Sequence, residues 1–109
     1  MAITDESTTD LEVNGYSDWV LAGDPGKVVM VDCVDENGDS AAWGSVSVTL
    51  LYSIDGKMRS VLEDKNDGLI ENRTAGFSKV LDASGYVSIL ASGISGQTVR
   101  LSVGRDSVS

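Results

Sequence analysis

The chain has 109 residues, of which 17 are acidic and 8 are basic, so its net charge is −9 and a single domain is expected. That charge repels phosphates, and no basic cluster occurs, so neither nucleic acid nor an anionic membrane surface is an expected partner. Histidine is absent, which excludes Ser-His and Cys-His nucleophiles and most zinc sites. We therefore expect no enzyme activity and no cofactor.

Residues 1–14 are polar, acidic and rich in Thr and Ser, which predicts an extended N-terminal arm that is disordered on its own. The arm has neither a basic start nor an apolar run, so no secretion signal is predicted. No apolar pattern ties the arm to its own domain. We therefore expect its acidic side chains to bind a partner, namely Asp5, Glu6 and Asp10.

The expected domain spans residues 15–105, followed by a short tail at 106–109. Residues 16–21 and 27–34 predict the first two strands, joined by a turn at Asp24-Pro25-Gly26. The second strand is apolar on both faces, which is typical of a central strand. The lone cysteine, Cys33, falls in this strand and is expected to be a buried, inert thiol.

Residues 44–63 give the clearest pattern, because apolar and hydroxyl side chains alternate from Val46 to Ile54. This period of two predicts a strand with one buried face. Asp55-Gly56 follows directly and predicts a tight hairpin turn, with the return strand over residues 57–62.

The rest of the chain continues the pattern of short strands. Residues 64–73 are the most polar, with Leu69 and Ile70 as the expected anchors. Three further strands are predicted at 76–83, 86–91 and 97–104, separated by Gly-containing turns.

About seven strands without any helical periodicity predict an all-β fold. Each sheet has an apolar face to cover, so two packed antiparallel sheets are expected, in a jelly-roll or immunoglobulin-like sandwich.

Two acidic turns resemble part of a calcium loop. Asp35, Asn37 and Asp39 alternate, but Ser40 stands where the loop needs glycine and Val46 where it needs glutamate. Asp64, Asn66 and Asp67 are similar. In both places a solvated turn is the simpler interpretation.

The aromatic residues divide into two groups. Trp19 and Phe77 are expected to fill the core. Tyr16 and Trp43 are candidates for a partner surface, and Trp43 could equally be a loop lid packed on the core.

The whole chain resembles the small head decoration (cement) proteins of tailed phages. It is short, acidic, without disulfides, and rich in Gly, Ser and Val, and the run from Val80 to Ser88 has the character of phage structural proteins. The resemblance implies a non-enzymatic virion protein, made in the host cytoplasm. Such a protein binds the major capsid protein on the capsid exterior, often as a trimer, and stabilises the head.

A second hypothesis is a carbohydrate- or receptor-binding sandwich module of a phage fibre or surface protein. A third is a generic bacterial immunoglobulin-like module. Sugar binding would require exposed aromatic rings around a groove, for which the candidates are Trp43, Tyr16 and Tyr86.

Overall fold

A computed structural model describes residues 2–22, 26–64, 68–81 and 84–107. This part of the chain contains eleven strands and no helix, and so none that could cross a membrane. Predictions at Asp24-Pro25, Asn66-Asp67 and residues 82–83 fall outside it. The strands are β1 (Ala2–Leu11), β2 (Gly15–Tyr16), β3 (Val20–Leu21), β4 (Lys27–Val34), β5 (Ser47–Ser53), β6 (Ser60–Val61), β7 (Glu63–Asp64), β8 (Gly68–Leu69), β9 (Phe77–Val80), β10 (Tyr86–Ser92) and β11 (Thr98–Ser107).

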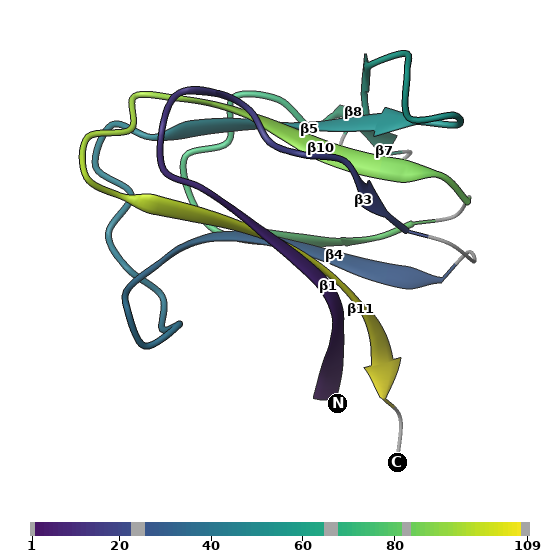
Figure 1. Cartoon of the computed structure of the whole chain (residues 1–109), viewed down its shortest axis with the longest axis horizontal. Helices are drawn as coiled ribbons and strands as arrows, with labels where there is room; N and C mark the ends of the chain where they lie inside the picture. Colours follow the sequence, from purple (N-terminus) through teal and green to yellow (C-terminus); the bar gives the residue numbers. More distant parts are fainter. Residues whose placement is uncertain (1, 23–25, 65–67, 82–83, 108–109) are drawn as a thin grey trace.

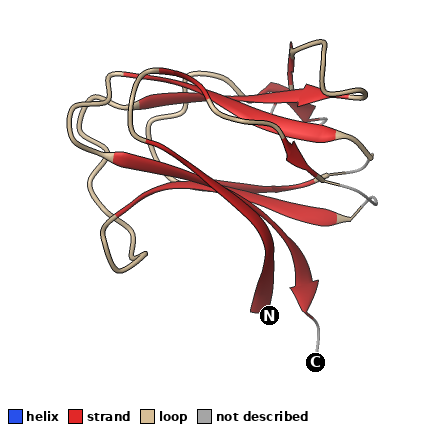
Figure 2. Ribbon diagram, viewed as in Figure 1, coloured by secondary structure: helices blue, strands red, loops and turns tan. Residues whose placement is uncertain are grey.

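The strands form two antiparallel sheets that pack face to face (Figures 1 and 2). One sheet has the order β1-β11-β4-β9, and the other has the order β2-β10-β5-β6 with β3 also pairing β10. A small hairpin, β7-β8, stands beside them. The predicted all-β sandwich is confirmed. The strands outnumber the predicted seven because several are only two residues long.

The core lies between β4 and β11 of one sheet and β5 and β10 of the other. Strand alternation sends every second side chain inward. The alternating apolar residues of β10 and β11 are buried, as are Val29, Val31 and Cys33 of β4, and β4 is central, between β11 and β9, as predicted. The largest fully buried side chains include Leu50, Ile70, Ile89, Leu101, Val29 and Val31.

The N-terminal segment corrects the prediction of a separate arm. Residues Ala2 to Leu11 form β1, which pairs with β11 at nine positions, from Ala2 opposite Ser107 to Leu11 opposite Val99. A bulge between Asp5 and Ser7 shifts the register. Leu11 joins the buried core. Strand β11 continues to Ser107 and so includes the first two residues of the predicted tail, and β1 and the end of β11 lie side by side (Figure 1).

The first predicted strand, over residues 16–21, is divided into β2 and β3 by Ser17. Ser17 is buried, its backbone N–H donates to the Ile89 carbonyl, and its hydroxyl accepts the Ile89 N–H at 3.0 Å. A hydroxyl that takes over a sheet hydrogen bond interrupts the regular ladder at this point.

The hairpin after β5 is wider than predicted. Leu51 pairs with Val61 and Tyr52 with Ser60, so residues 54–59 form a loop instead of a two-residue turn. A type I′ turn needs a positive φ at both central residues, and among the described residues other than glycine only Asn72 has one. Asp55 therefore does not have the positive φ that this turn requires, although Gly56 does, with φ at 75°.

We expect Leu50→Ala and Leu101→Ala each to lower the free energy of unfolding by about 2–5 kcal/mol, because both side chains are fully buried between the sheets. Leu69→Ala is the control, since Leu69 is half exposed on β8, and it should cost less than about 1 kcal/mol. Urea unfolding of the three variants measures this. Similar small losses at all three positions would contradict the assigned core.

Deleting residues 2–11 should strongly destabilise the isolated domain. The deletion removes a whole strand and the Leu11 side chain, and leaves β11 as an unprotected sheet edge. Thermal unfolding should show a large drop in melting temperature or loss of the folded state. An unchanged melting temperature would mean that these residues are an independent arm after all.

Candidate functional site

The outer face of the five-stranded sheet carries an aromatic pair beneath a guanidinium group. Tyr16 on β2 lies opposite Leu90 of β10, and Trp19 follows in the link to β3. The Cζ atom of Arg59 lies 4.3 Å from the centre of the Tyr16 ring and 5.2 Å from that of Trp19. Both distances are within the range of a cation–π interaction. Trp19, predicted to fill the core, is therefore half-buried under Arg59 instead.

Arg59 reaches this position because the 54–59 loop turns back over the sheet. Gly56 packs against the ring of Tyr86, since a Cβ atom added to this glycine would lie 3.5 Å from it. In Figure 1 the segment after β5 stands above the upper sheet. Strand β6 is at the opposite edge of the sheet from β2, so Arg59 bridges the two edges.

The Asp55 carboxylate organises this loop. Its Oδ1 atom accepts hydrogen bonds from the backbone N–H groups of Lys57 at 2.9 Å and Met58 at 3.2 Å, and from the Ser53 hydroxyl. These donors, led by Lys57, hold the pKa of Asp55 below its ordinary value. The aspartate thus makes an Asx turn, which is the reason that the loop is wider than a two-residue hairpin.

The loop leaves large apolar side chains in solvent. Ile54 is 82% exposed and Met58 is 72% exposed, and both line a hollow of about 330 Å³ together with Tyr52, Ser53, Asp55 and Ser60. Tyr16 is 55% exposed. We use the name Tyr16 patch for Tyr16, Trp19 and Arg59 together with Ile54 and Met58, the exposed apolar residues of the loop that carries Arg59. Large apolar side chains left exposed are candidates for an interaction surface.

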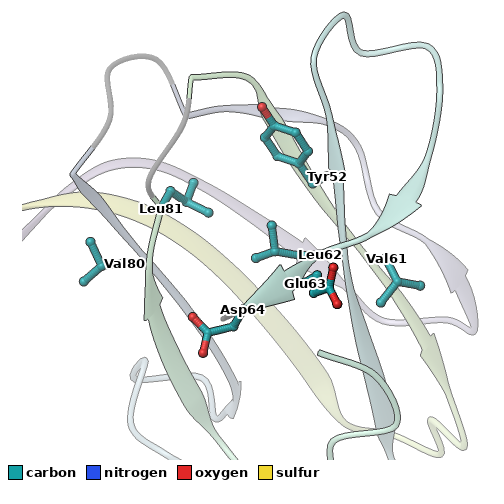
Figure 3. A pocket seen from close by; sticks show the side chains of 7 residues that line it. All are labelled: Tyr52, Val61, Leu62, Glu63, Asp64, Val80 and Leu81. Carbon is teal, nitrogen blue, oxygen red and sulfur yellow. The ribbon is translucent and has the colours of Figure 1, made fainter. Parts of the chain in front are cut away.

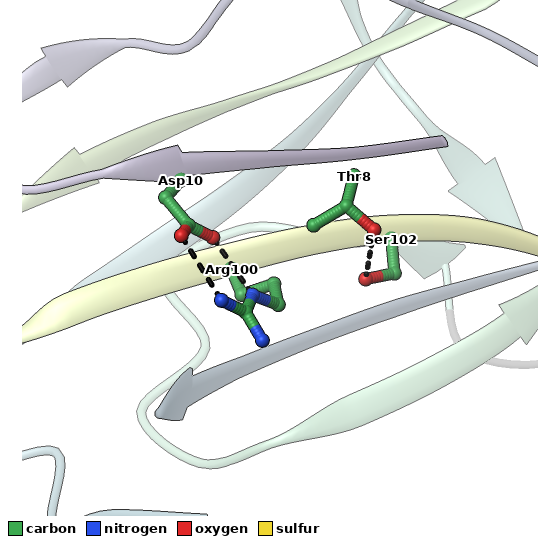
Figure 4. A network of polar contacts seen from close by, with 4 residues as sticks. All are labelled: Thr8, Asp10, Arg100 and Ser102. Carbon is green, nitrogen blue, oxygen red and sulfur yellow. Dashed lines mark hydrogen bonds and ion pairs between the residues drawn. The ribbon is translucent and has the colours of Figure 1, made fainter. Parts of the chain in front are cut away.

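On the outer face of the four-stranded sheet, polar side chains tie β1 to β11 (Figure 4), while Met30 and Val80 are exposed on β4 and β9. Arg100 on β11 donates to both carboxylate oxygens of Asp10 on β1, at 2.8 and 3.1 Å. Two residues along, at the next pair on the same face, the hydroxyls of Thr8 and Ser102 lie 3.2 Å apart. Asp10 thus uses both oxygens within its own sheet.

Trp43 packs on the core as a loop lid. Its indole N–H donates to the Asp32 carboxylate at 2.8 Å, and the Ser40 hydroxyl donates to the same group at 2.7 Å. The Cys33 backbone N–H also donates to Asp32. Asp32 therefore fixes the 35–43 loop against β4, and the polar end of Trp43 is used inside the chain.

The five residues predicted to bind a partner do not form one site. Asp5, Glu6 and Asp10 share β1, while Trp43 lies in the loop beside Asp32. Tyr16 belongs to the other sheet, where it meets Arg59.

The loop residues Ile54, Met58 and Arg59 were not predicted as part of a site. Ile54 was assigned to the core because the alternation of β5 seemed to continue through it, whereas the strand ends at Ser53.

The turn at residues 35–39 uses its acidic groups internally. The Oδ1 atom of Asp35 accepts the backbone N–H groups of Asn37 at 2.8 Å and Asp39 at 3.0 Å. Within the described ranges no group of three or more His, Cys, Asp or Glu side chains is arranged to hold a metal ion.

A smaller apolar hollow opens at the seam between the sheets (Figure 3). Val80 and Leu81 lie on one side of it and Val61 and Leu62 on the other, around about 270 Å³ of space. This volume is below the usual range for pockets that enclose a small molecule, so an apolar side chain is a better match to it than a cofactor.

Comparison with protein-family models, curated proteins and solved structures finds no match to this chain. Its function must therefore be argued from its own residues.

We expect loss of the Asp55 carboxylate to loosen the 54–59 loop. Because the folded-state pKa is lowered, the contribution of this group is present above the pKa of the unfolded chain and disappears as the pH falls through the folded-state value. Protection of the Lys57 and Met58 amides from hydrogen exchange should thus persist through the ordinary carboxyl range and fall only at lower pH.

Two substitutions separate the roles of charge and hydrogen bonding. Asp55→Ala should abolish the amide protection at every pH, whereas Asp55→Asn keeps an acceptor oxygen and should retain much of it without the pH dependence. Equal protection in Asp55→Ala and the unsubstituted protein would show that the carboxylate does not hold the loop.

Proposed function

We propose that this chain is a non-enzymatic structural module that binds the outer surface of a viral shell and adds cohesion to it, as a decoration protein. The observation that carries the proposal is the Tyr16 patch, in which one loop exposes two large apolar side chains and also holds Arg59 over two aromatic rings. The partner on this hypothesis is the major capsid protein, and the binding unit is a homo-oligomer such as a trimer.

The composition of the patch favours a protein partner. Tyr, Trp, Met and Arg are the residue types enriched at protein interfaces, and all four occur here. The Arg59 side chain is held over two aromatic rings, and the backbone of its loop is held by the Asp55 carboxylate. Because Arg59 and the loop backbone are already ordered, they lose little conformational freedom on binding.

The same geometry offers less support for sugar binding. A sugar stacks on a free aromatic face, but Arg59 lies over Tyr16 and Gly56 covers Tyr86. The indole N–H of Trp43 is bonded to Asp32. All three aromatic residues considered for a sugar surface thus make contacts within the chain. The experiment below distinguishes the decoration role from the alternative, a receptor-binding module.

The proposal does not depend on the N-terminal residues. They pair with β11 of their own domain, so the Tyr16 patch replaces them as the proposed anchor. The net charge of −9 adds a long-range attraction to a basic shell surface, and this attraction should weaken with added salt.

The test compares particles that carry this protein with particles from which it has been removed. A ligand that binds only the assembled shell stabilises it by mass action, and many copies linking neighbours multiply a modest contact. Adding the protein back should raise the temperature at which the shells rupture. Equal rupture temperatures, or a protein found only on fibres, would refute the decoration role and favour the receptor-binding alternative.

Met58→Asp should weaken attachment roughly tenfold or more, because it places a charge in an apolar interface. Val80→Asp is the matched control, since Val80 is 59% exposed on β9 of the opposite sheet. Both variants should fold normally, which circular dichroism checks. Co-sedimentation with stripped shells measures attachment, and similar binding by Met58→Asp and the unsubstituted protein would exclude the Tyr16 patch as the anchor.

A further inference from the structure

The chain contains the dipeptide Asn-Gly twice, as Asn14-Gly15 and Asn37-Gly38. An asparagine before glycine is open to spontaneous deamidation, because the missing Cβ leaves the glycine nitrogen free to approach the asparagine side chain. The two sites share the reactive Asn-Gly pair and differ in their flanking residues. In the folded structure the two asparagines make different contacts.

Asn14-Gly15 is fixed by long-range contacts. The Oδ1 atom of Asn14 accepts the backbone N–H of Ile94 at 2.9 Å, which fixes the side-chain amide across the end of the sandwich. Gly15 is part of β2 and pairs with Ala91 of β10. Rotating the Asn14 side chain onto the Gly15 nitrogen requires both contacts to be lost.

Asn37-Gly38 lies in an exposed turn with short-range contacts. The Asn37 side-chain amide makes no hydrogen bond to any described residue, and both residues are exposed. The Gly38 N–H donates to the Asp35 carbonyl at 3.0 Å, and the Asn37 N–H donates to the Asp35 carboxylate. These bonds join residues at most three apart, so a local opening of the turn breaks them without disturbing the sheets.

We propose that Asn37 is a site of spontaneous deamidation in the folded protein, and that the fold protects Asn14. The Gly38 nitrogen attacks Cγ of Asn37 and forms a succinimide ring, while the Cγ–Nδ2 bond breaks. The proton of the Gly38 N–H leaves with that nitrogen as ammonia. Water then opens the ring at Cγ, which gives aspartate, or at the main-chain carbonyl, which gives isoaspartate.

The product adds a negative charge to a turn that already holds Asp35, Glu36 and Asp39. The turn lies close to the four-stranded sheet, because a Cβ atom on Gly38 would lie 3.3 Å from Nη1 of Arg100. A new carboxylate at position 37 would thus form near the guanidinium that binds Asp10. The modification therefore alters the charge balance on this face.

The experiment ages the full folded chain in mildly alkaline buffer and follows both peptides by mass spectrometry, with isoaspartate methyltransferase labelling as a second readout. The Asn37 peptide should convert at least several-fold faster than the Asn14 peptide. In urea the two rates should converge, because the protection of Asn14 comes from the fold. Asn37→Ser should remove the fast signal and leave the slow one.

Equal rates in the folded protein, faster conversion at Asn14, or no conversion at Asn37 would each overturn the proposal. Unequal rates that persist in urea would also overturn it, since neighbouring sequence and not the fold would then set the difference. Circular dichroism before and after ageing confirms that the measured chain stays folded.

Discussion

The structure depends on the need to bury two apolar sheet faces against each other. Strands β4 and β11 supply one face and β5 and β10 supply the other, and none of these faces could remain in water alone. The burial of Leu50 opposite the sheet that holds Leu101 is therefore the central interaction. The shorter strands β2, β3, β6 and β9 each pair with one of these four, whereas β7 and β8 pair with each other. Because their inner faces are committed to the core, only the two outer faces and the seams are available for binding.

The side chains on the outer faces of the two sheets are held by different interactions. On the four-stranded sheet, the Asp10–Arg100 ion pair and the Thr8–Ser102 hydroxyl contact join β1 to β11. On the five-stranded sheet a loop crosses the surface and brings a cation onto two aromatic rings, while Ile54 and Met58 extend into solvent. The first arrangement suits a stable, hydrated surface. The second leaves apolar area that another protein could cover, and for this reason the functional proposal is built on it.

Strands with strong alternation could be predicted from the sequence, and the remaining ones could not. The bounds of β4 matched the prediction, and the inward residues of β10 and β11 followed from their period of two. Strand β1 gave no such signal, because residues 4–10 are all acidic or hydroxyl-bearing and the strand is held by backbone pairing with a segment 88 to 105 residues away. The 54–59 loop depends on the side-chain bonds of Asp55, which compete with the tight turn that Asp-Gly favours. Of the Tyr16 patch, only Tyr16 was predicted, because its neighbours gather through tertiary contacts.

The burial of Cys33 makes the chain its own probe of global unfolding. This thiol lies in the central strand, fully enclosed, and burial together with the nearby Asp32 charge raises its pKa. Alkylating reagents react with the thiolate form of cysteine. The folded protein should therefore resist them for two reasons: the sulfur is buried, and its raised pKa keeps it protonated. Because Cys33 pairs with Val99 of β11 inside the sheet and its carbonyl accepts the Ala41 N–H, fraying of the edge strand β1 leaves the sulfur covered. The rate of alkylation at this single atom thus reports how often the whole sandwich opens, without any introduced label.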